Sequence, residues 1–195
     1  MNDRLISLLE KLQSLENDIL LEIDKKEQQF SYEIQKKKVL FESETKKAHK
    51  ILIKKIRYYL RDASIKNILT APFIWACLIP ALMMDLVLTV YQSVCFPVYG
   101  IPKVRRGDYV VIDRQHLSYL NLIERLNCVY CGYFNGVIGY SREIAGRTEQ
   151  YWCPIKHARK IKSFHSRYKN FFDYGDADGY RAKIEEVRRR FEDIK

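Results

Sequence analysis

The chain has 195 residues, a formal net charge of +10 and five cysteines. An odd number of cysteines argues against a disulfide framework. The charged opening MNDRLISLLEKLQSLEND lacks a small-residue cleavage site after an apolar core, so it does not predict a secretory signal. The basic balance suits an anionic surface, which could be lipid headgroups or nucleic acid.

Composition divides the chain into four segments and predicts a mainly helical fold. Residues 1–66 are highly charged and contain neither glycine nor proline, which predicts a long coiled-coil-like helix or a pair of helices. Residues 67–102 carry one charged side chain, Asp85. Residues 103–172 are basic and aromatic and predict a small helical domain with cysteines and histidines, and residues 173–195 predict a C-terminal amphipathic helix.

Apolar residues recur in the first segment with the three-four alternation of a coiled-coil seam. The seam is Leu5, Leu8, Leu12, Leu15, Ile19 and, after a stutter, Ile23, Phe30, Ile34, Phe41, Ala48 and Leu52. If continuous, about sixty helical residues would make a rod of roughly 90 Å. Because so narrow a stripe needs a partner, we expect a homo-oligomer through residues 5–60, with a helical hairpin within one chain as the alternative.

The second segment is a candidate membrane segment, because about twenty apolar helical residues cross a hydrocarbon core of roughly 30 Å. Basic residues stand on both sides of it: Lys54, Lys55, Arg57, Arg61 and Lys66 before, and Lys103, Arg105 and Arg106 after. Positive flanks on one side of the membrane favour a re-entrant helical hairpin bending near Pro80, or a monotopic form. A single membrane-embedded helix in an oligomer, with Asp85 facing its counterpart, stays open.

The basic run KKAHKILIKKIRYYLR, at residues 46–61, is typical of a helix at a headgroup layer. The apolar segment favours lipid over nucleic acid, and the sequence contains no recognisable nucleic-acid module. We therefore expect membrane lipids as partners and a membrane location, with most of the soluble part cytoplasmic. The sequence identifies no protein partner.

The third segment predicts three short helices separated by glycines. Asp113 is a good N-cap for the first of them. Gly132, Gly136 and Gly139 would then form a turn, and Gly146 would close the second helix before the third begins. This layout would bring the motifs NCVYCGYFNG, at residues 127–136, and YWCPIKH, at residues 151–157, close together.

Those two motifs supply Cys128, Cys131, Cys153 and His157. The first two are three residues apart and the last two are four apart, so each pair shares one turn or one helix face. Three thiolates and an imidazole form a ligand set that zinc prefers in tetrahedral structural sites. We therefore predict a Cys3His zinc site, with iron as the alternative metal.

Three other interpretations of these residues stay open. The CxxC pair could exchange thiols, although Cys128 would fall late in its predicted helix, where the helix dipole opposes a thiolate. An iron centre could use carboxylates and imidazoles on packed helices. Its candidates are Asp113, His116, Glu124, Glu143, Glu149 and His157, but no Glu-x-x-His pair is present. The cysteines could also be small buried hydrophobic residues.

The stretches DRQHLSYLNLIERLNCVYCGYFNG and RTEQYWCPIKHARKIKSFHSRY follow an apolar segment that ends in CFPVYGIPKVRRGDYVVIDR. Together they resemble a family of small, membrane-associated bacterial proteins to which no activity is assigned. The resemblance covers roughly residues 70–170 and leaves the N-terminal rod outside. It implies a bacterial origin and membrane association, and it supplies neither a mechanism nor a catalytic residue.

The C-terminal stretch DYGDADGYRAKIEE partly matches the spacing of a calcium loop. A tyrosine and an alanine occupy two of the usual ligand positions, so we expect a turn that leads into a charged amphipathic helix instead.

From the sequence we expect a membrane-anchored metal-binding protein, in which zinc shapes a structural or assembly module. A thiol-redox or iron-dependent membrane enzyme and a coiled-coil membrane scaffold without metal are the alternatives. A closed four-ligand zinc site leaves no position for a substrate, so zinc here predicts structure more than chemistry.

Overall fold

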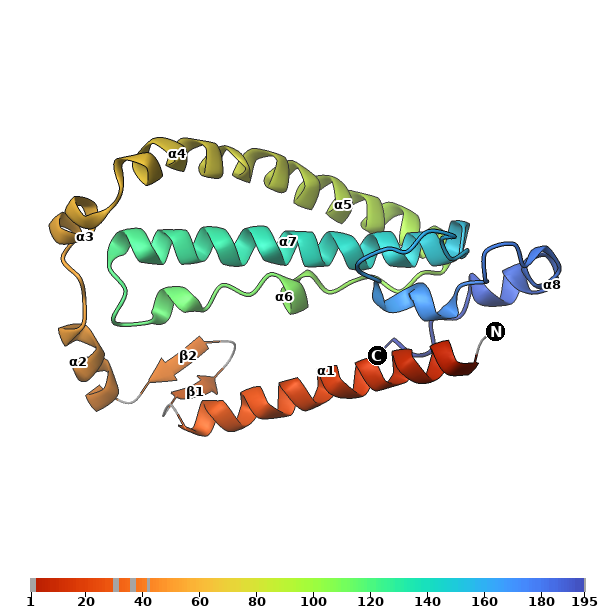
Figure 1. Cartoon of the computed structure of the whole chain (residues 1–195), viewed down its shortest axis with the longest axis horizontal. Helices are drawn as coiled ribbons and strands as arrows, with labels where there is room; N and C mark the ends of the chain where they lie inside the picture. The colour runs from red at the N-terminus through yellow and green to blue at the C-terminus, as the bar shows by residue number, and fades with distance from the viewer. Residues whose placement is uncertain (1–2, 30–31, 36–37, 42, 195) are drawn as a thin grey trace. The chain divides into compact units, whose positions relative to one another are not determined.

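The computed structural model describes residues 3–29, 32–35, 38–41 and 43–194, and it confirms a mainly helical chain (Figure 1). The α-helices are α1 (Asp3–Gln29), α2 (Ser43–Ile51), α3 (Ile56–Asp62), α4 (Ile65–Ala76), α5 (Leu78–Tyr99), α6 (Arg106–Tyr109), α7 (Leu122–Trp152) and α8 (Ala177–Val187). Two 3-10 helices, η1 (Arg114–His116) and η2 (Ser166–Asn170), and two strands, β1 (Tyr32–Gln35) and β2 (Lys38–Phe41), complete the described elements.

The chain forms two compact units. The first consists of Met1–Glu10, Ala81–Tyr109 and Val137–Lys195. The second consists of Lys11–Pro80 and Val110–Gly136. Both α5 and α7 contribute residues to each unit, so the unit boundaries fall within continuous helices.

The N-terminal segment is not a continuous rod, because α1 ends at Gln29 and an antiparallel hairpin of β1 and β2 follows. The hairpin pairs Tyr32 with Phe41 and Gln35 with Lys38. Its sequences, YEIQ and KVLF, are rich in β-branched and aromatic residues that suit a pleated surface. Of the predicted seam, Ile34 and Phe41 therefore lie in strands, and Phe30 lies outside the described residues.

The apolar segment is helical through Pro80, so the bend of a re-entrant hairpin is not formed there. Ile65–Tyr99 is a 35-residue helical stretch, with α4 capped at Cys77 and α5 beginning at Leu78. Pro80 falls in the first turn of α5, where a missing backbone N–H leaves no intrahelical bond unmade. Within the part of the chain that the structure describes, the stretch Ile65–Tyr99 is the one helix long and apolar enough to cross a membrane.

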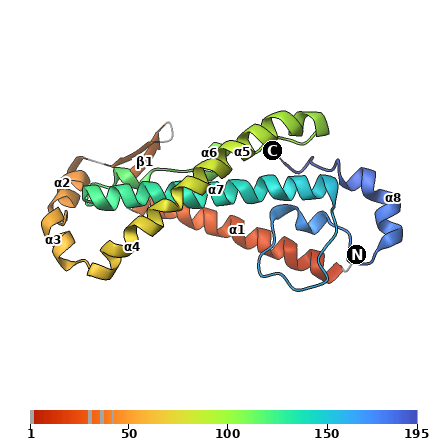
Figure 2. The same ribbon diagram turned by 90° about the horizontal axis from the view of Figure 1, so that it is seen from above.

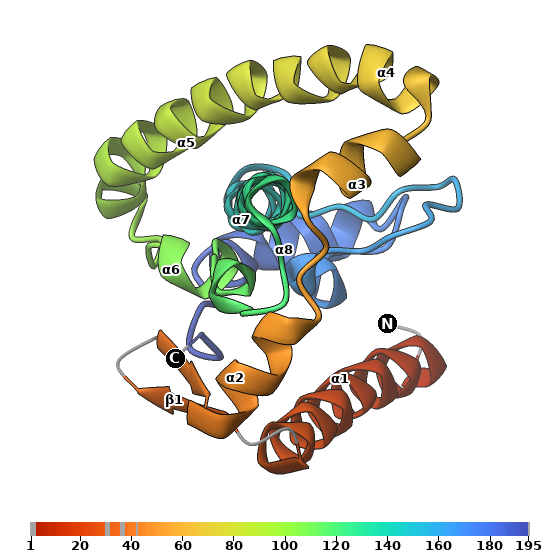
Figure 3. The same cartoon turned by 90° about the vertical axis from the view of Figure 1, so that its left-hand side faces the viewer.

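Helix α7 runs without interruption through the positions that predicted a turn. Figure 3, which looks along α7, shows its turns stacked in one column. Added to Gly132, a Cβ would lie 3.0 Å from the Val111 carbonyl oxygen, and added to Gly146 it would lie 2.8 Å from His165 Nδ1. These glycines allow neighbouring segments to approach the helix closely. Because α7 is one continuous helix, the predicted division into three short helices is wrong.

In the second unit, a reciprocal cap begins α7. Asn121 Oδ1 accepts the Glu124 backbone N–H at 3.0 Å, and Glu124 Oε2 accepts the Asn121 N–H at 2.8 Å. Further along, the Tyr130 hydroxyl donates to the Ile74 carbonyl at 2.7 Å, and its ring packs 5.0 Å from that of Trp75. The first half of α7 is therefore held against the end of α4.

In the first unit, α5 and the second half of α7 lie side by side around one apolar core (Figures 1 and 2). The buried core residues are Phe96, Ile101, Val104, Tyr140, Ile144 and Phe191. Helix α5 ends at Tyr99, and the φ of +69° at the next residue, Gly100, allows the Ile101 N–H to reach the Phe96 carbonyl at 2.9 Å. The segment after α5 thereby turns back over the core.

The C-terminal segment contains helix α8, which ends at Val187 and is therefore shorter than the helix predicted for residues 173–195. Its N-cap is Asp176, whose Oδ1 accepts the Gly179 N–H at 2.9 Å. The Asp176 carboxylate therefore caps a helix, in the stretch whose spacing partly matches a calcium loop.

Candidate functional site

The four predicted zinc ligands lie at distant points along α7 and beyond its end. Cys128 and Cys131 are in its first half, Cys153 directly follows its last residue, and His157 comes four residues later. Twenty-two positions separate Cys131 from Cys153, so the two lie about 30 Å apart along the helix axis. The continuous helix therefore keeps the two pairs of predicted ligands apart, whereas the predicted turn would have brought them together.

Among the residues that the structure describes, no group of three or more His, Cys, Asp or Glu side chains is placed to hold a metal ion. Burial, and then the charge of Glu149, raise the pKa of the Cys153 thiol, which disfavours the thiolate that zinc requires. The His157 backbone N–H donates to the Tyr168 hydroxyl at 2.9 Å. The Cys3His zinc site therefore finds no support within one chain.

The three glutamates among the candidates for an iron centre have separate partners. Glu124 caps the start of α7, as described above. Glu143 accepts Arg147 Nε at 2.9 Å and the Ser166 hydroxyl at 2.8 Å, and Glu149 Oε2 lies 3.0 Å from His165 Nε2. Their partners are a backbone amide, an arginine, a serine and a histidine, so these carboxylates stabilise the fold locally.

Helix α5 has two faces that differ in what they contact. Its buried residues are Ala81, Asp85, Gln92 and Phe96, spaced by four, seven and four positions so that they share one side of the helix. The outer face is exposed and, apart from Ser93, apolar: Leu82, Met83, Leu86, Val87, Val90, Val94 and Val98 have between 52% and 77% of their surface accessible. An apolar face of this kind marks an interaction surface.

The polar groups of the inner face are bonded to the rest of the first unit. Asp85 accepts Arg106 Nε at 2.9 Å and Arg106 Nη2 at 2.7 Å. Gln92 accepts the Val104 N–H at 2.9 Å and donates to the Val104 carbonyl at 3.2 Å, and it also donates to the Tyr140 hydroxyl. These bonds fix which side of α5 faces outward.

The residues before α4 and in its first turn form a basic, partly apolar surface in the second unit. Lys54, Lys55, Arg57, Arg61 and Lys66 are all exposed. The guanidinium groups of Arg57 and Arg61 lie 4.7 and 5.1 Å from the centre of the Tyr58 ring. Such a mixture of cations and aromatic rings suits contact with anionic headgroups.

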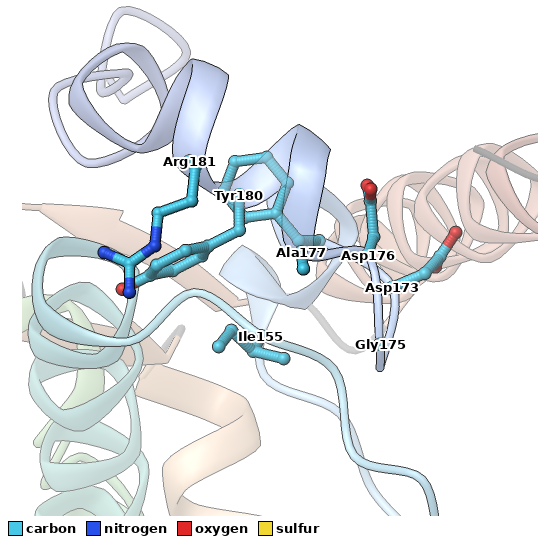
Figure 4. Close-up of a pocket in the computed structure, with 8 residues that line it drawn as sticks. Ile155, Asp173, Gly175, Asp176, Ala177, Tyr180 and Arg181 are labelled. Atoms are coloured by element: carbon cyan, nitrogen blue, oxygen red, sulfur yellow. The ribbon is translucent and has the colours of Figure 1, made fainter.

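An open cavity of about 250 Å³ lies at the start of α8 (Figure 4). Its lining residues are Ile155, Phe172, Asp173, Gly175, Asp176, Ala177, Tyr180 and Arg181. The Asp173 carboxylate accepts Lys156 Nζ at 2.7 Å and Asp176 caps α8, while the Arg181 guanidinium lies over the Tyr180 ring. The cavity is therefore bounded mostly by groups that the fold already uses.

Sequence reasoning missed the division of α5 into two faces. The signal was present, because Asp85 and Gln92 stand seven residues apart in an otherwise apolar run, which places them on one side of a helix. Their partners, Arg106 and Val104, come from an irregular segment whose path no helical or strand period predicts.

No protein-family model, curated protein or solved structure matches this chain. The resemblance of residues 70–170 to a bacterial membrane-associated family therefore stays a prediction.

Proposed function

We propose that this chain is a monotopic membrane-anchoring module that lies on one leaflet of a bilayer. The exposed apolar face of α5 enters the acyl-chain region, and the basic residues around the apolar segment contact anionic headgroups. The observation that carries this proposal is the outer face of α5, where seven large apolar side chains are more than half exposed. Fully burying a leucine or valine side chain stabilises by roughly 1.5–3 kcal/mol, so even shallow insertion of seven is favourable.

The neighbours of α5 favour an orientation along the membrane over one across it. Thr89 and Tyr91 of α5 lie against Tyr140 and Thr148 of α7. That part of α7 carries Arg142, Glu143, Arg147 and Glu149, which a spanning α5 would take to the same depth in the bilayer. Charged side chains at the bilayer centre cost about 2.5–3.5 kcal/mol each or more, so α5 is better placed flat at the interface.

Binding to lipid vesicles tests this proposal. Full-length protein should co-sediment with vesicles of phosphatidylcholine and phosphatidylglycerol, and the double variant Leu86→Glu/Val94→Glu should lose most of that binding. Leu126→Glu is the matched control, because Leu126 is 51% exposed on α7 and lies outside the proposed surface.

The salt dependence separates the two parts of the contact. Raising the salt concentration should weaken binding by screening the basic residues, and the remainder should persist through apolar insertion. Equal binding of the parent protein and the α5 double variant, at both salt concentrations and with both variants folded by circular dichroism, would reject the proposed surface.

A further inference from the structure

We propose that α1 pairs with the α1 helix of a second copy of this chain in a short parallel coiled coil. This pairing does not depend on the membrane proposal, because it uses a different helix and a partner of different chemistry.

The apolar residues of α1 are accessible to a partner. Every residue from Lys11 to Lys25 is exposed. Among them are Leu12, Leu15, Ile19, Leu20, Leu21 and Ile23, with between 51% and 61% of their surface accessible. A helix without tertiary packing is only marginally stable in water, because most helical stability in proteins comes from packing an apolar face.

The charge of α1 argues against an anionic membrane as that partner. Asp3–Gln29 contains four basic and seven acidic residues, whereas the whole chain has 34 basic and 24 acidic residues, which leaves 30 and 17 outside α1. The helix is thus acidic in a basic protein. Anionic headgroups attract basic helices, so α1 is the element least suited to lie on them.

The spacing of the apolar residues fits a second copy of the same helix. With Leu5, Leu12 and Ile19 at the a positions of the heptad and Leu8 and Leu15 at the d positions, the seam faces an identical seam across a twofold axis. Leu20 and Leu21 fall at the outer positions b and c. The step to Ile23 is a stutter, which limits the regular packing to the first part of α1.

Charge complementarity sets the direction of the pair. Lys11 occupies position g, and Glu16 occupies position e of the next heptad. In a parallel pair these two positions meet across the interface, so each dimer gains two symmetry-related contacts between Lys11 and the partner's Glu16. An antiparallel pair brings g to g and e to e instead, and it makes neither contact.

The experiment is to measure the mass of the full chain by sedimentation velocity in a mild non-ionic detergent. The parent protein should be a dimer that dissociates on dilution. Leu12→Glu/Ile19→Glu should be a monomer, because both changes lie in the seam. Leu20→Glu/Leu21→Glu should remain a dimer, because those two leucines are equally exposed and point away from the seam.

A charge swap tests the parallel direction. Lys11→Glu should raise the dissociation constant several-fold, and Lys11→Glu/Glu16→Lys should restore it. A monomeric parent at every concentration, or equal dissociation of the two leucine pairs, would overturn the pairing. Loss of vesicle binding by the seam variant, with a parent that is monomeric in detergent, would instead assign α1 to the membrane.

Discussion

At the scale of single residues, His165 is a titratable group with a hydrogen-bond partner at each of its two ring nitrogens. Its Nδ1 accepts the Arg167 backbone N–H at 3.2 Å, so the ring proton is on Nε2, which lies 3.0 Å from Glu149 Oε2. Burial lowers the pKa of His165, and the charge of Arg142 acts in the same direction, while Glu149 and Glu143 partly oppose them. Protonating Nδ1 would also remove the cap that begins η2.

We therefore expect the protein to lose stability as the pH falls below about 6.5, the ordinary pKa of histidine. The unfolded chain takes up a proton there while the folded chain, whose His165 pKa is lower, does not, so the loss continues until the pH falls through that lower pKa. His165→Asn keeps an acceptor for the cap but cannot titrate. Urea denaturation at several pH values between 5 and 8 gives the free energy of unfolding as a function of pH. This free energy should fall less steeply with decreasing pH in the variant than in the parent protein. An equally steep fall in both would contradict the role assigned to His165.

Arg167 is the buried charge on which the end of the chain depends. Its guanidinium donates to Asp193 through two nitrogens, at 2.9 Å each, and to Gln150 Oε1 at 2.6 Å. Burial raises the pKa of the Asp193 carboxyl, but the hydrogen bonds and charge of Arg167 outweigh burial and hold that pKa below its usual value. Only a planar, forked donor can make all of these bonds.

Arg167→Lys should lower the free energy of unfolding by about 2 kcal/mol, because lysine leaves buried acceptors without donors. Arg189→Lys is the control, since the Arg189 side chain is 72% exposed and its pair with Glu185 contributes little. Denaturation in urea, followed by circular dichroism, measures both. Similar small losses for the two variants would mean that the Arg167 network adds nothing to stability.

At the scale of elements, the glycines of α7 show why the sequence alone did not predict one continuous helix. Glycines between the Cys128–Cys131 pair and the Cys153–His157 pair predicted turns, because glycine is common at helix ends and in turns. In α7 they serve another purpose: Gly139 lies where a Cβ would be 3.3 Å from the Tyr109 ring. Whether a glycine ends a helix or admits a neighbour depends on segments distant in sequence, which no local pattern contains.

A substitution of Gln92 tests whether the inner face of α5 packs against the protein or faces lipid. Gln92→Leu makes the helix more apolar, but it leaves the buried N–H and C=O of Val104 without partners. Each unsatisfied group costs about 1–3 kcal/mol, so we expect a loss of roughly 2–6 kcal/mol in the free energy of unfolding. Val90→Leu, on the outer face, should change it by less than about 0.5 kcal/mol. Greater stability in Gln92→Leu would indicate a helix surrounded by lipid.

At the scale of the whole molecule, composition predicted more than motifs did. The absence of glycine and proline before Pro72, the single charge in residues 67–102 and the basic flanks predicted a helical chain with a membrane-compatible segment. Helicity and the long apolar helix are confirmed. The zinc prediction required two motifs to meet in space, and that depends on whether the chain between them turns. Local side-chain spacing does not determine such a path.

The depth of α5 in a bilayer distinguishes a flat helix from a spanning one. Met83, Val90 and Val94 lie within about 40° of one another on its outer face, and the first and last are eleven residues, or about 16 Å, apart along the axis. A single tryptophan placed at each of these positions in turn, with Trp75 and Trp152 changed to Phe, can be quenched by lipids brominated at known acyl positions. A flat helix should give the same quenching profile at all three positions.

Ile138→Trp in the same background is the control, because Ile138 is 46% exposed on α7 and should remain outside the acyl chains. A spanning helix would place Met83, Val90 and Val94 at depths up to about 16 Å apart, so their quenching profiles would differ from one another. It would also carry the charged residues of α7 into the bilayer, so quenching at Ile138 comparable to that at Val90 would reject the monotopic arrangement. Equal depths on α5 with none at Ile138 are expected only if the polar bonds of Asp85 and Gln92 keep the inner face of the helix turned away from the lipid.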